Sequence, residues 1–393
     1  MGLSLVSNPW IAKNMSPEDY AISGYYTSFS SLISPIIIFY LVHFFIKEYF
    51  RCDENQRIKL FAAIAKALIW FSGIISILCF IGLFIYLKFC TNSLSFPILP
   101  YLALMVFSLP LTGLLNLQLA KYRIAKRANA FFILNVSNGI LNILCTIAFV
   151  VILKLGAFGK LLGPLICNAI VFIYMLYSLR NIFKIETSIS EYKTIFIFCL
   201  PLALSAMLGY FTHGYSTTYL ESIGDNTEYG IYIVGISIGT YITIFSTAVN
   251  NTFQPDIYES IIKKQRNRYL KFCGLQLAII AIIICAFILI APYAISLLTA
   301  NRYVASTPYA RISSIAALTS SLYYLINNYS IATNRPKLYL YTTIIGSIGI
   351  ILLLPIAVKN WLYIGGAWMS VLSFIVFFFI NLGLLYIIKP KTT

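Results

Sequence analysis

The feature that most limits the possible folds of this chain is a series of apolar runs, each long enough for a helix to cross a membrane. A span of the roughly 30 Å hydrocarbon core needs about 20 apolar residues. Eleven runs of this kind lie at residues 22–45, 67–87, 101–120, 130–153, 161–179, 194–215, 230–253, 272–292, 308–332, 338–358 and 364–388. Barrel strands would be about ten residues long with strict alternation, a pattern that the sequence lacks. We therefore predict an all-α integral membrane protein.

The composition agrees with this fold class. Hydrophobic residues make up 60% of the chain and charged residues 10%, whereas a soluble domain carries about 25% charged residues. A net charge of +16 could indicate nucleic-acid binding. The basic residues lie in short loops between the apolar runs, however, so membrane topology explains them and no nucleic-acid partner is expected.

The basic residues also predict the orientation in the membrane. When the loops are assigned alternately to two sides, one side holds 21 Lys and Arg residues and the other holds 7. Lysine and arginine are enriched in cytoplasmic loops, so the richer side is predicted to be cytoplasmic. This places the C-terminus inside the cell and the N-terminus outside.

The sequence contains an internal repeat with an offset of 209 residues. The matching pairs are Asp19 with Glu228, Tyr20 with Tyr229, Tyr49 with Tyr258, Lys126 with Arg335, Gly156 with Gly365 and Arg180 with Lys389. The paired loops fall on the same side of the membrane, so the two halves are expected to be parallel, as in several transporter folds. We predict an N-terminal bundle over residues 1–190 and a C-terminal six-helix bundle over residues 191–393.

The N-terminal bundle is expected to have five helices, with its first helix largely missing. The run 194–215, moved back by the repeat offset, would fall before Met1. The segment from Gly2 to Asn14 has the position of the end of that first helix. On this interpretation the reading frame upstream of Met1 would encode roughly 15 to 25 further apolar residues, the length of one span.

Several motifs carry a resemblance to a known family. They are MSPEDYAIS at Met15–Ser23, FCLPLALSAML at Phe198–Leu208, GDNTEYGIY at Gly224–Tyr232, FQPDIYE at Phe253–Glu259 and LYIGGAW at Leu362–Trp368. In this order the chain resembles the multidrug/oligosaccharidyl-lipid/polysaccharide exporter superfamily, and within it is similar to polysaccharide flippases of the O-antigen type. One departure is that many relatives have an acidic residue near the end of the seventh helix, where this chain has His213.

The resemblance implies a function in surface polysaccharide synthesis, including that of lipopolysaccharide. The chain would flip undecaprenyl-pyrophosphate-linked oligosaccharide across the bacterial inner membrane by alternating access. Its partners would be that lipid-linked substrate and membrane lipids, and other proteins of polysaccharide assembly are further candidates. A multidrug exporter of the same fold and a membrane-embedded polysaccharide polymerase or ligase are the alternatives.

The charged and nucleophilic residues argue against an enzyme. All twelve acidic residues lie at helix ends or in loops, so no carboxylate at mid-membrane is available for a proton or sodium relay. The sequence shows no Ser/His/Asp set, no paired carboxylates and no glycine-rich phosphate loop. The eight cysteines have no metal-ligand spacing. No catalytic residue, cofactor or metal is predicted.

Two cations near the outer ends of helices are candidate ligands of the substrate pyrophosphate. Arg311 begins the run 308–332 and His213 lies near the end of the run 194–215. The simpler interpretation is that Arg311 extends to the interface and that His213 is an interfacial ring. For His43 and Lys66, at the cytoplasmic edge, we expect such interface anchoring.

Amides and prolines inside the spans are further candidates. The amides proposed to bind sugar are Asn138, Asn142, Asn250, Asn251, Asn327 and Asn328. Hydrogen bonding between helices is the alternative role for these amides. The prolines proposed as hinges are Pro35, Pro110, Pro201 and Pro355. A proline removes one backbone hydrogen bond and can kink its helix, so a static packing shape is the alternative.

Overall fold

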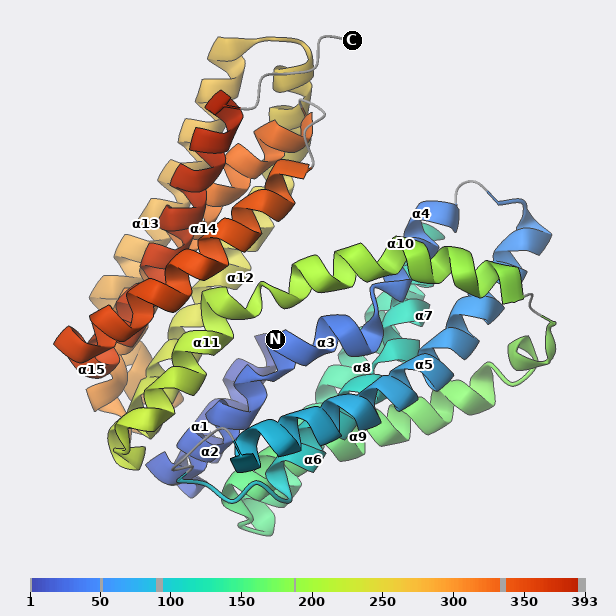
Figure 1. Ribbon diagram of the computed structural model, residues 1–393. Helices are drawn as coiled ribbons and strands as arrows, with labels where there is room; N and C mark the ends of the chain where they lie inside the picture. The colour runs from blue at the N-terminus through green and yellow to red at the C-terminus, as the bar shows by residue number, and fades with distance from the viewer. Residues whose placement is uncertain (1, 50–51, 90–94, 187–188, 333–336, 388–393) are drawn as a thin grey trace. The chain divides into compact units, whose positions relative to one another are not determined.

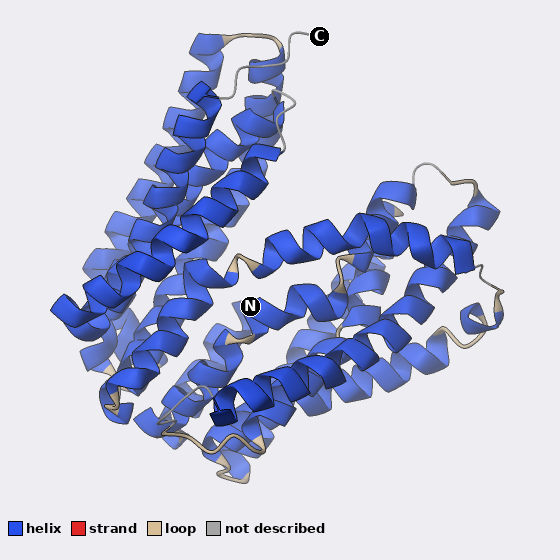
Figure 2. Cartoon of the chain, viewed as in Figure 1, coloured by secondary structure: helices blue, strands red, loops and turns tan. Residues whose placement is uncertain are grey.

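A computed structural model describes residues 2–49, 52–89, 95–186, 189–332 and 337–387 of the chain (Figure 1). The described residues form helices joined by short loops and contain no strand (Figure 2). The chain divides into two compact units, unit 1 from Met1 to Met207 and unit 2 from Leu208 to Thr393. These units are defined by contacts within the structure, whereas the halves 1–190 and 191–393 were defined by the sequence repeat. The boundary between those two halves stays a prediction.

The predicted fold class is confirmed. Among the described residues, nine helical segments are long and apolar enough to cross a membrane. Two features reconcile this number with the eleven predicted runs. The last segment holds two of the runs, separated at Leu362, whose backbone is not helical (φ 47°, ψ −131°). The run 308–332 is helical but is rich in Ser, Thr, Tyr and Asn and is not among the nine segments.

Unit 1 contains ten α-helices among its described residues. They are α1 (Gly2–Asn14), α2 (Pro17–Ser28), α3 (Ser30–Ile38), α4 (Leu41–Tyr49), α5 (Glu54–Phe89), α6 (Tyr101–Leu111), α7 (Gly113–Ile124), α8 (Ala128–Ile147), α9 (Gly156–Ser178) and α10 (Ile189–Met207). A π-helical turn, η1 (Ala148–Ile152), ends α8, and a 3-10 turn, η2 (Ile182–Lys184), follows α9.

Unit 2 contains five α-helices among its described residues. They are α11 (Tyr210–Leu220), α12 (Asn226–Ile262), α13 (Arg266–Leu298), α14 (Thr307–Ala332) and α15 (Lys337–Ile387), with 3-10 turns at η3 (Glu221–Ile223) and η4 (Val304–Ser306). The break at Leu362 divides α15 into two helices.

The helix ends repeat at the offset that the sequence predicts. Moving unit 1 forward by 209 residues places Pro17 on Asn226, Phe89 on Leu298, Ala128 on Lys337 and Ser178 on Ile387. Pro17 and Asn226 begin α2 and α12, and Phe89 and Leu298 end α5 and α13. Ala128 and Lys337 begin α8 and α15, and Ser178 and Ile387 end α9 and α15. Helices α1 to α9 of unit 1 therefore repeat the helix order of unit 2, and α1 corresponds to α11. Helix α10 has no counterpart in unit 2 at this offset.

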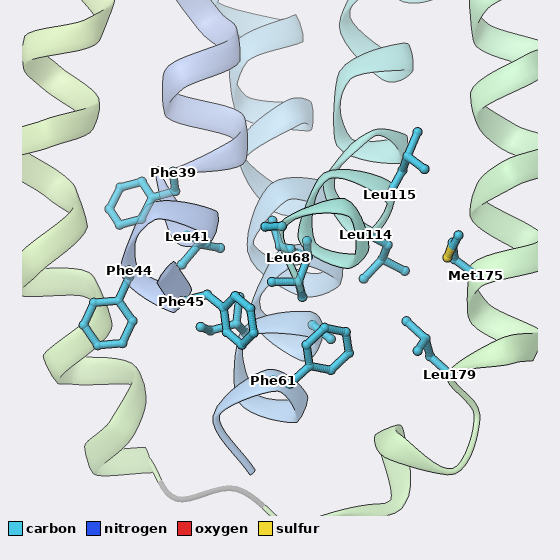
Figure 3. Packing of buried hydrophobic residues seen from close by; sticks show 14 of the residues in the cluster. Phe39, Leu41, Phe44, Phe45, Phe61, Leu68, Leu114, Leu115, Met175 and Leu179 are labelled. Atoms are coloured by element: carbon cyan, nitrogen blue, oxygen red, sulfur yellow. The ribbon is translucent and has the colours of Figure 1, made fainter. Parts of the chain in front are cut away.

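An apolar core holds the helices of unit 1 together (Figure 3). Phe45 of α4, Phe61 and Leu68 of α5, and Leu117 of α7 are each at most 1% exposed. The aromatic rings of Phe45 and Phe61 meet edge to face, with centroids 5.7 Å apart. Burial of each such side chain contributes roughly 1.5–3 kcal/mol. This core lies where the ends of α4, α5 and α7 converge and positions the polar residues around it.

Small residues allow the helices of unit 2 to pack closely. Gly235 and Gly239 form a Gly-x-x-x-Gly pattern on α12 and face α14. A Cβ at Gly235 would lie 2.6 Å from the carbonyl oxygen of Ser306. Further along the same interface, the hydroxyls of Ser246 and Ser321 share a hydrogen bond of 2.7 Å. Close backbone approach and hydroxyl pairing are the main sources of helix association inside a membrane.

Candidate substrate-binding site

One cavity of unit 1 is lined by polar and cationic side chains. It has a volume of about 540 Å³ and lies between α3, α4, α7 and the start of α8. Its polar lining consists of Ser34, Tyr40, His43, Asn116 and Arg123. The remaining lining is aliphatic or aromatic, and no Asp or Glu is part of it. A cavity of this kind suits an anionic group with an adjoining polar body.

A helix break places two of these side chains. The helix α3 ends at Ile38, and Phe39 and Tyr40 then adopt left-handed backbone conformations with φ of 51° and 53°. Bulky residues rarely adopt such angles, which cost roughly 1–3 kcal/mol each. The chain resumes as α4, and the His43 amide donates to the Tyr40 carbonyl oxygen at 3.0 Å. The rings of Tyr40 and His43 stack with centroids 4.5 Å apart.

The opposite wall comes from α7. Asn116 and Arg123 are seven residues apart, which places them on one face of the helix, two turns from each other. Both side chains are exposed, and within the described part of the chain Arg123 forms no ion pair. An unpaired guanidinium with its donors directed to a cavity can bind a phosphate in bidentate fashion.

Arg311 lies in unit 2 and bonds to a neighbouring helix. Its Nε donates to the carbonyl oxygen of Ile288 on α13 at 3.0 Å. The side chain is half-buried. Its proposed role toward the pyrophosphate stays a prediction, and the structure adds a packing role between α13 and α14. The side chain of His213, the second predicted cation, lies outside the described residues.

The predicted amides of unit 2 divide between helix pairing and exposure. Asn250 Oδ1 accepts a hydrogen bond of 2.7 Å from Gln276 Nε2, which links α12 to α13. Asn328 Oδ1 accepts from Gln254 Nε2 at 3.4 Å and from Tyr258 at 3.5 Å. These bonds match the helix-pairing role of membrane amides.

The other asparagine of each adjacent pair, Asn251 or Asn327, has a different environment. Asn251 is exposed, whereas Asn327 is 8% exposed with a carbonyl oxygen that has no partner among the described residues. Asn327 is also 16 residues from Arg311 along α14, about 24 Å at 1.5 Å per residue. The structure thus does not bring Arg311 and these amides into one site, and sugar binding by the amides stays a prediction.

The predicted amides of unit 1 contact α9 or their own helix. Asn138 accepts from the Cys167 thiol of α9 at 3.7 Å through both its backbone and side-chain oxygens. The backbone oxygen of Asn142 accepts from the Thr146 hydroxyl at 2.8 Å. Neither residue lines the cavity at α3 and α7.

The predicted hinge prolines lie near helix breaks in two cases. Pro35 precedes the break at Phe39 by four residues and itself lines the cavity. Pro110 lies two residues before Thr112, which separates α6 from α7. Pro355 lies within the first half of α15, seven residues before the break at Leu362. The side chain of Pro201 lies outside the described residues.

Five polar residues of the cavity were not proposed as site residues from the sequence: Ser34, Tyr40, His43, Asn116 and Arg123. His43 was expected to be an interface anchor, and Asn116 and Arg123 were not proposed to bind substrate. The available signal was the seven-residue spacing of Asn116 and Arg123, which predicts a shared helix face. Lys66, the other expected anchor, donates to the carbonyl oxygen of Ile185 at 2.5 Å.

Comparison with known proteins identifies relatives over nearly the whole chain. A family model described as "Polysaccharide biosynthesis protein" matches residues 11–308. Among curated proteins no sequence matches. This family model confirms the predicted resemblance to proteins of polysaccharide synthesis, and the solved structures that follow show the exporter fold.

Three solved structures illustrate the similarity in fold. An inward-facing multidrug resistance MATE family transporter of the MOP superfamily has a TM-score of 0.72 at 14% identity, covering 100% of this chain and 96% of that one. The lipid II flippase MurJ, in an inward closed conformation, has a TM-score of 0.68 at 16% identity, covering 98% and 85%. A MOP superfamily transporter from Pyrococcus furiosus, whose binding pocket is described as having reverse polarity, has a TM-score of 0.59 at 13% identity, covering 100% and 92%. At these identities the similarity shows the fold alone.

Proposed function

This chain belongs to the polysaccharide biosynthesis protein family of membrane transporters, and on that premise we propose that it flips undecaprenyl-pyrophosphate-linked oligosaccharide across the bacterial inner membrane. The product would serve surface polysaccharide synthesis. The related fold of a lipid II flippase supports a lipid-linked substrate.

The observation that carries this proposal is the charge of the cavity in unit 1. Arg123 brings a positive charge to its lining, and no carboxylate lines it. A diphosphate needs positive donors, and charge-assisted hydrogen bonds are roughly twice as strong as neutral ones. A cation drug would need negative charge instead, so the lining favours the flippase over a multidrug exporter.

The remaining lining suits the sugar of the substrate. Asn116 offers an amide donor and acceptor, and Tyr40 offers a ring face with a hydroxyl. The apolar surface along α3 would face the first isoprene units. In this mechanism the cavity binds the headgroup while the lipid tail stays in the bilayer, and the two units alternate access to it.

The proposal is tested with Arg123→Gln in a strain that lacks its own flippase. We expect surface polysaccharide to fall about tenfold, the effect of losing one charge-assisted contact worth about 1.4 kcal/mol. The matched control is Lys126→Gln, which removes a charge from an exposed residue three positions away that does not line the cavity. Protein levels are matched by immunoblot.

Two outcomes would count against the proposal. A normal amount of surface polysaccharide with Arg123→Gln at matched protein level would show that the cavity does not take part in transport. A change in drug resistance, with polysaccharide unchanged, would favour the multidrug exporter.

A further inference from the structure

A second, smaller cavity opens at the end of unit 1 where α4 ends and α5 begins. Its volume is about 210 Å³, room for several water-sized groups. Its charged lining consists of Arg57 and Glu54 of α5 and Lys121 of α7, and its aromatic lining includes Tyr49 and Phe61. It lies on a different side of α7 from the cavity described above, and the two cavities share no lining residue.

Both cations of this cavity are held in place by aromatic rings. The Arg57 guanidinium lies 4.6 Å from the ring centroid of Tyr49, and its Nε donates to the Tyr49 carbonyl oxygen at 3.0 Å. The Lys121 ammonium lies 4.5 Å from the ring centroid of Phe61, which is 1% exposed. Contacts of this kind orient a cation without neutralising its charge.

The charge of the cavity is not balanced by the protein. Within the described residues neither Arg57 nor Lys121 forms an ion pair, and Glu54 is the one acidic residue of the lining. Two half-buried cations therefore share the cavity with one exposed carboxylate.

The internal repeat shows that the fold does not need this lysine. At the offset of 209 residues, Lys121 corresponds to Ser330 of α14. Ser330 is buried and donates to Asn381 of α15 at 2.9 Å. Packing at this position is thus possible with a small neutral side chain, and a half-buried charge costs free energy that a ligand can offset.

Two cations near the corresponding end of unit 2 are paired with acids of α12. Arg268 lies 3.3 Å from Glu259 and 3.6 Å from Asp256, and Lys263 lies 2.5 Å from Glu259. Acids of unit 2 thus neutralise Arg268 and Lys263, whereas within the described residues Arg57 and Lys121 of unit 1 have no acidic partner in an ion pair.

We propose that this end of unit 1 binds a phosphate group between Arg57 and Lys121. The guanidinium would donate two parallel hydrogen bonds through its terminal nitrogens, and the ammonium would supply a point charge from the other side. The phosphate can belong to free phosphate or to the headgroup of an anionic phospholipid. The inference is independent of the proposed transport function, because it concerns a different cavity.

The test measures both sources of phosphate on the full chain. In lipid-free neutral detergent, equilibrium dialysis with radiolabelled inorganic phosphate gives the number of bound ions and the Kd. Native mass spectrometry after addition of phosphatidylglycerol gives the number of retained lipids. The variants are Arg57→Gln and Lys121→Gln. Lys59→Gln is the matched control, because it removes an exposed charge on α5 two residues from Arg57, outside this cavity.

We expect one of two results to support the site. Saturable binding of one inorganic phosphate, weakened about tenfold in Arg57→Gln and Lys121→Gln but not in Lys59→Gln, would identify a free-phosphate site. Retention of phosphatidylglycerol that falls by one molecule in the same two variants, without phosphate binding, would identify a headgroup site. Binding of neither, or equal losses in all three variants, would overturn the proposal. Surface polysaccharide measured in parallel distinguishes failure here from failure of the flippase function.

Discussion

At the scale of single residues, the environment of a cation separates a binding role from a packing role. Arg123 lines an open cavity and has no ion-pair partner among the described residues, whereas Arg311 uses its Nε to join two helices. Both are arginines near the end of an apolar run. Their roles differ because the fold places different neighbours around each side chain.

Arg311→Ala is predicted to have two measurable effects. Loss of the hydrogen bond to Ile288 should lower the free energy of unfolding by about 1 kcal/mol, measured by denaturation in detergent. If the remaining guanidinium nitrogens also attract the substrate, surface polysaccharide should fall at matched protein level. Normal polysaccharide would leave Arg311 with its packing role alone.

Position 156 accommodates glycine better than any other residue. Its φ is +52°, and an added Cβ would collide with the carboxylate of Asp19. That carboxylate accepts a hydrogen bond of 2.8 Å from the Ala157 amide, so it cannot move away without losing the contact between α2 and α9.

Gly156→Ala is therefore predicted to destabilise unit 1 by about 1–3 kcal/mol, combining the cost of a left-handed alanine with the lost hydrogen bond. The measurement is the thermal midpoint in detergent. Gly82→Ala is the control, because Gly82 lies in the interior of α5 with nothing within 4 Å of an added Cβ. It should be neutral or stabilising, since alanine is the better helix former. Equal midpoints for the two variants would contradict the role of Gly156.

At the scale of helices, the breaks do more to shape the molecule than the prolines do. The chain passes Pro35 within α3 and breaks at Phe39, whereas Thr112, two residues after Pro110, keeps right-handed helical angles (φ −78°, ψ −16°). The break at Phe39 is what places Tyr40 and His43 at the cavity. The role of the prolines as hinges stays a prediction.

The segment 194–215 is divided between the two units. Its first part belongs to α10, which packs in unit 1, where the rings of Phe196 and Phe39 stack at 5.0 Å. Its last part belongs to α11 in unit 2. The chain therefore passes from unit 1 to unit 2 at Leu208 and Gly209.

The contact between α12 and α14 is predicted to depend on Gly239. An added Cβ there would collide with the hydroxyl of Ser313, so Gly239→Leu should force the two helices apart. We expect loss of folded protein, measured as the monodisperse fraction after detergent extraction. Gly274→Leu is the control on α13, where nothing lies within 4 Å of an added Cβ, and it should be tolerated. Comparable yields from both variants would argue against close packing of α12 on α14.

At the scale of the whole molecule, the distribution of Lys and Arg predicts the topology. The cavities at α4, α5 and α7 would then open toward the cytoplasm, since Arg57, Lys121 and Arg123 belong to the basic side. The C-terminal residues that carry Lys389 lie outside the described part of the chain.

Cysteine labelling tests this topology. In a variant without the eight native cysteines, we expect single cysteines at Arg123 and Arg266 to be protected from an impermeant reagent in intact cells, and one at Asn226 to react. Permeabilised cells provide the control for accessibility. Labelling of the Arg266 position from outside would reverse the orientation, and with it the side from which both cavities are loaded.

Much of the fold could be predicted from the sequence, and little of the site. The repeat offset, first seen in pairs such as Gly156 and Gly365, matches the helix ends from Pro17 to Ile387. Among the predicted site residues, Pro35 lines the main cavity, whereas Arg311 and Asn138 do not. Helix-facing amides and cavity-facing amides have the same residue type, so composition could not separate them.

The sequence by itself determined where the chain crosses the membrane, which loops are basic and that the helix order occurs twice. The hydropathy and charge of a segment determine whether it favours lipid or water, and this preference does not depend on which helices lie beside it. The tertiary structure alone decided which polar groups meet. Tyr40, His43 and Arg123 share a cavity because of a left-handed break after α3 and the packing of α4 against α7. The break and the helix packing depend on contacts between helices far apart in the chain, so a short run of residues does not determine them.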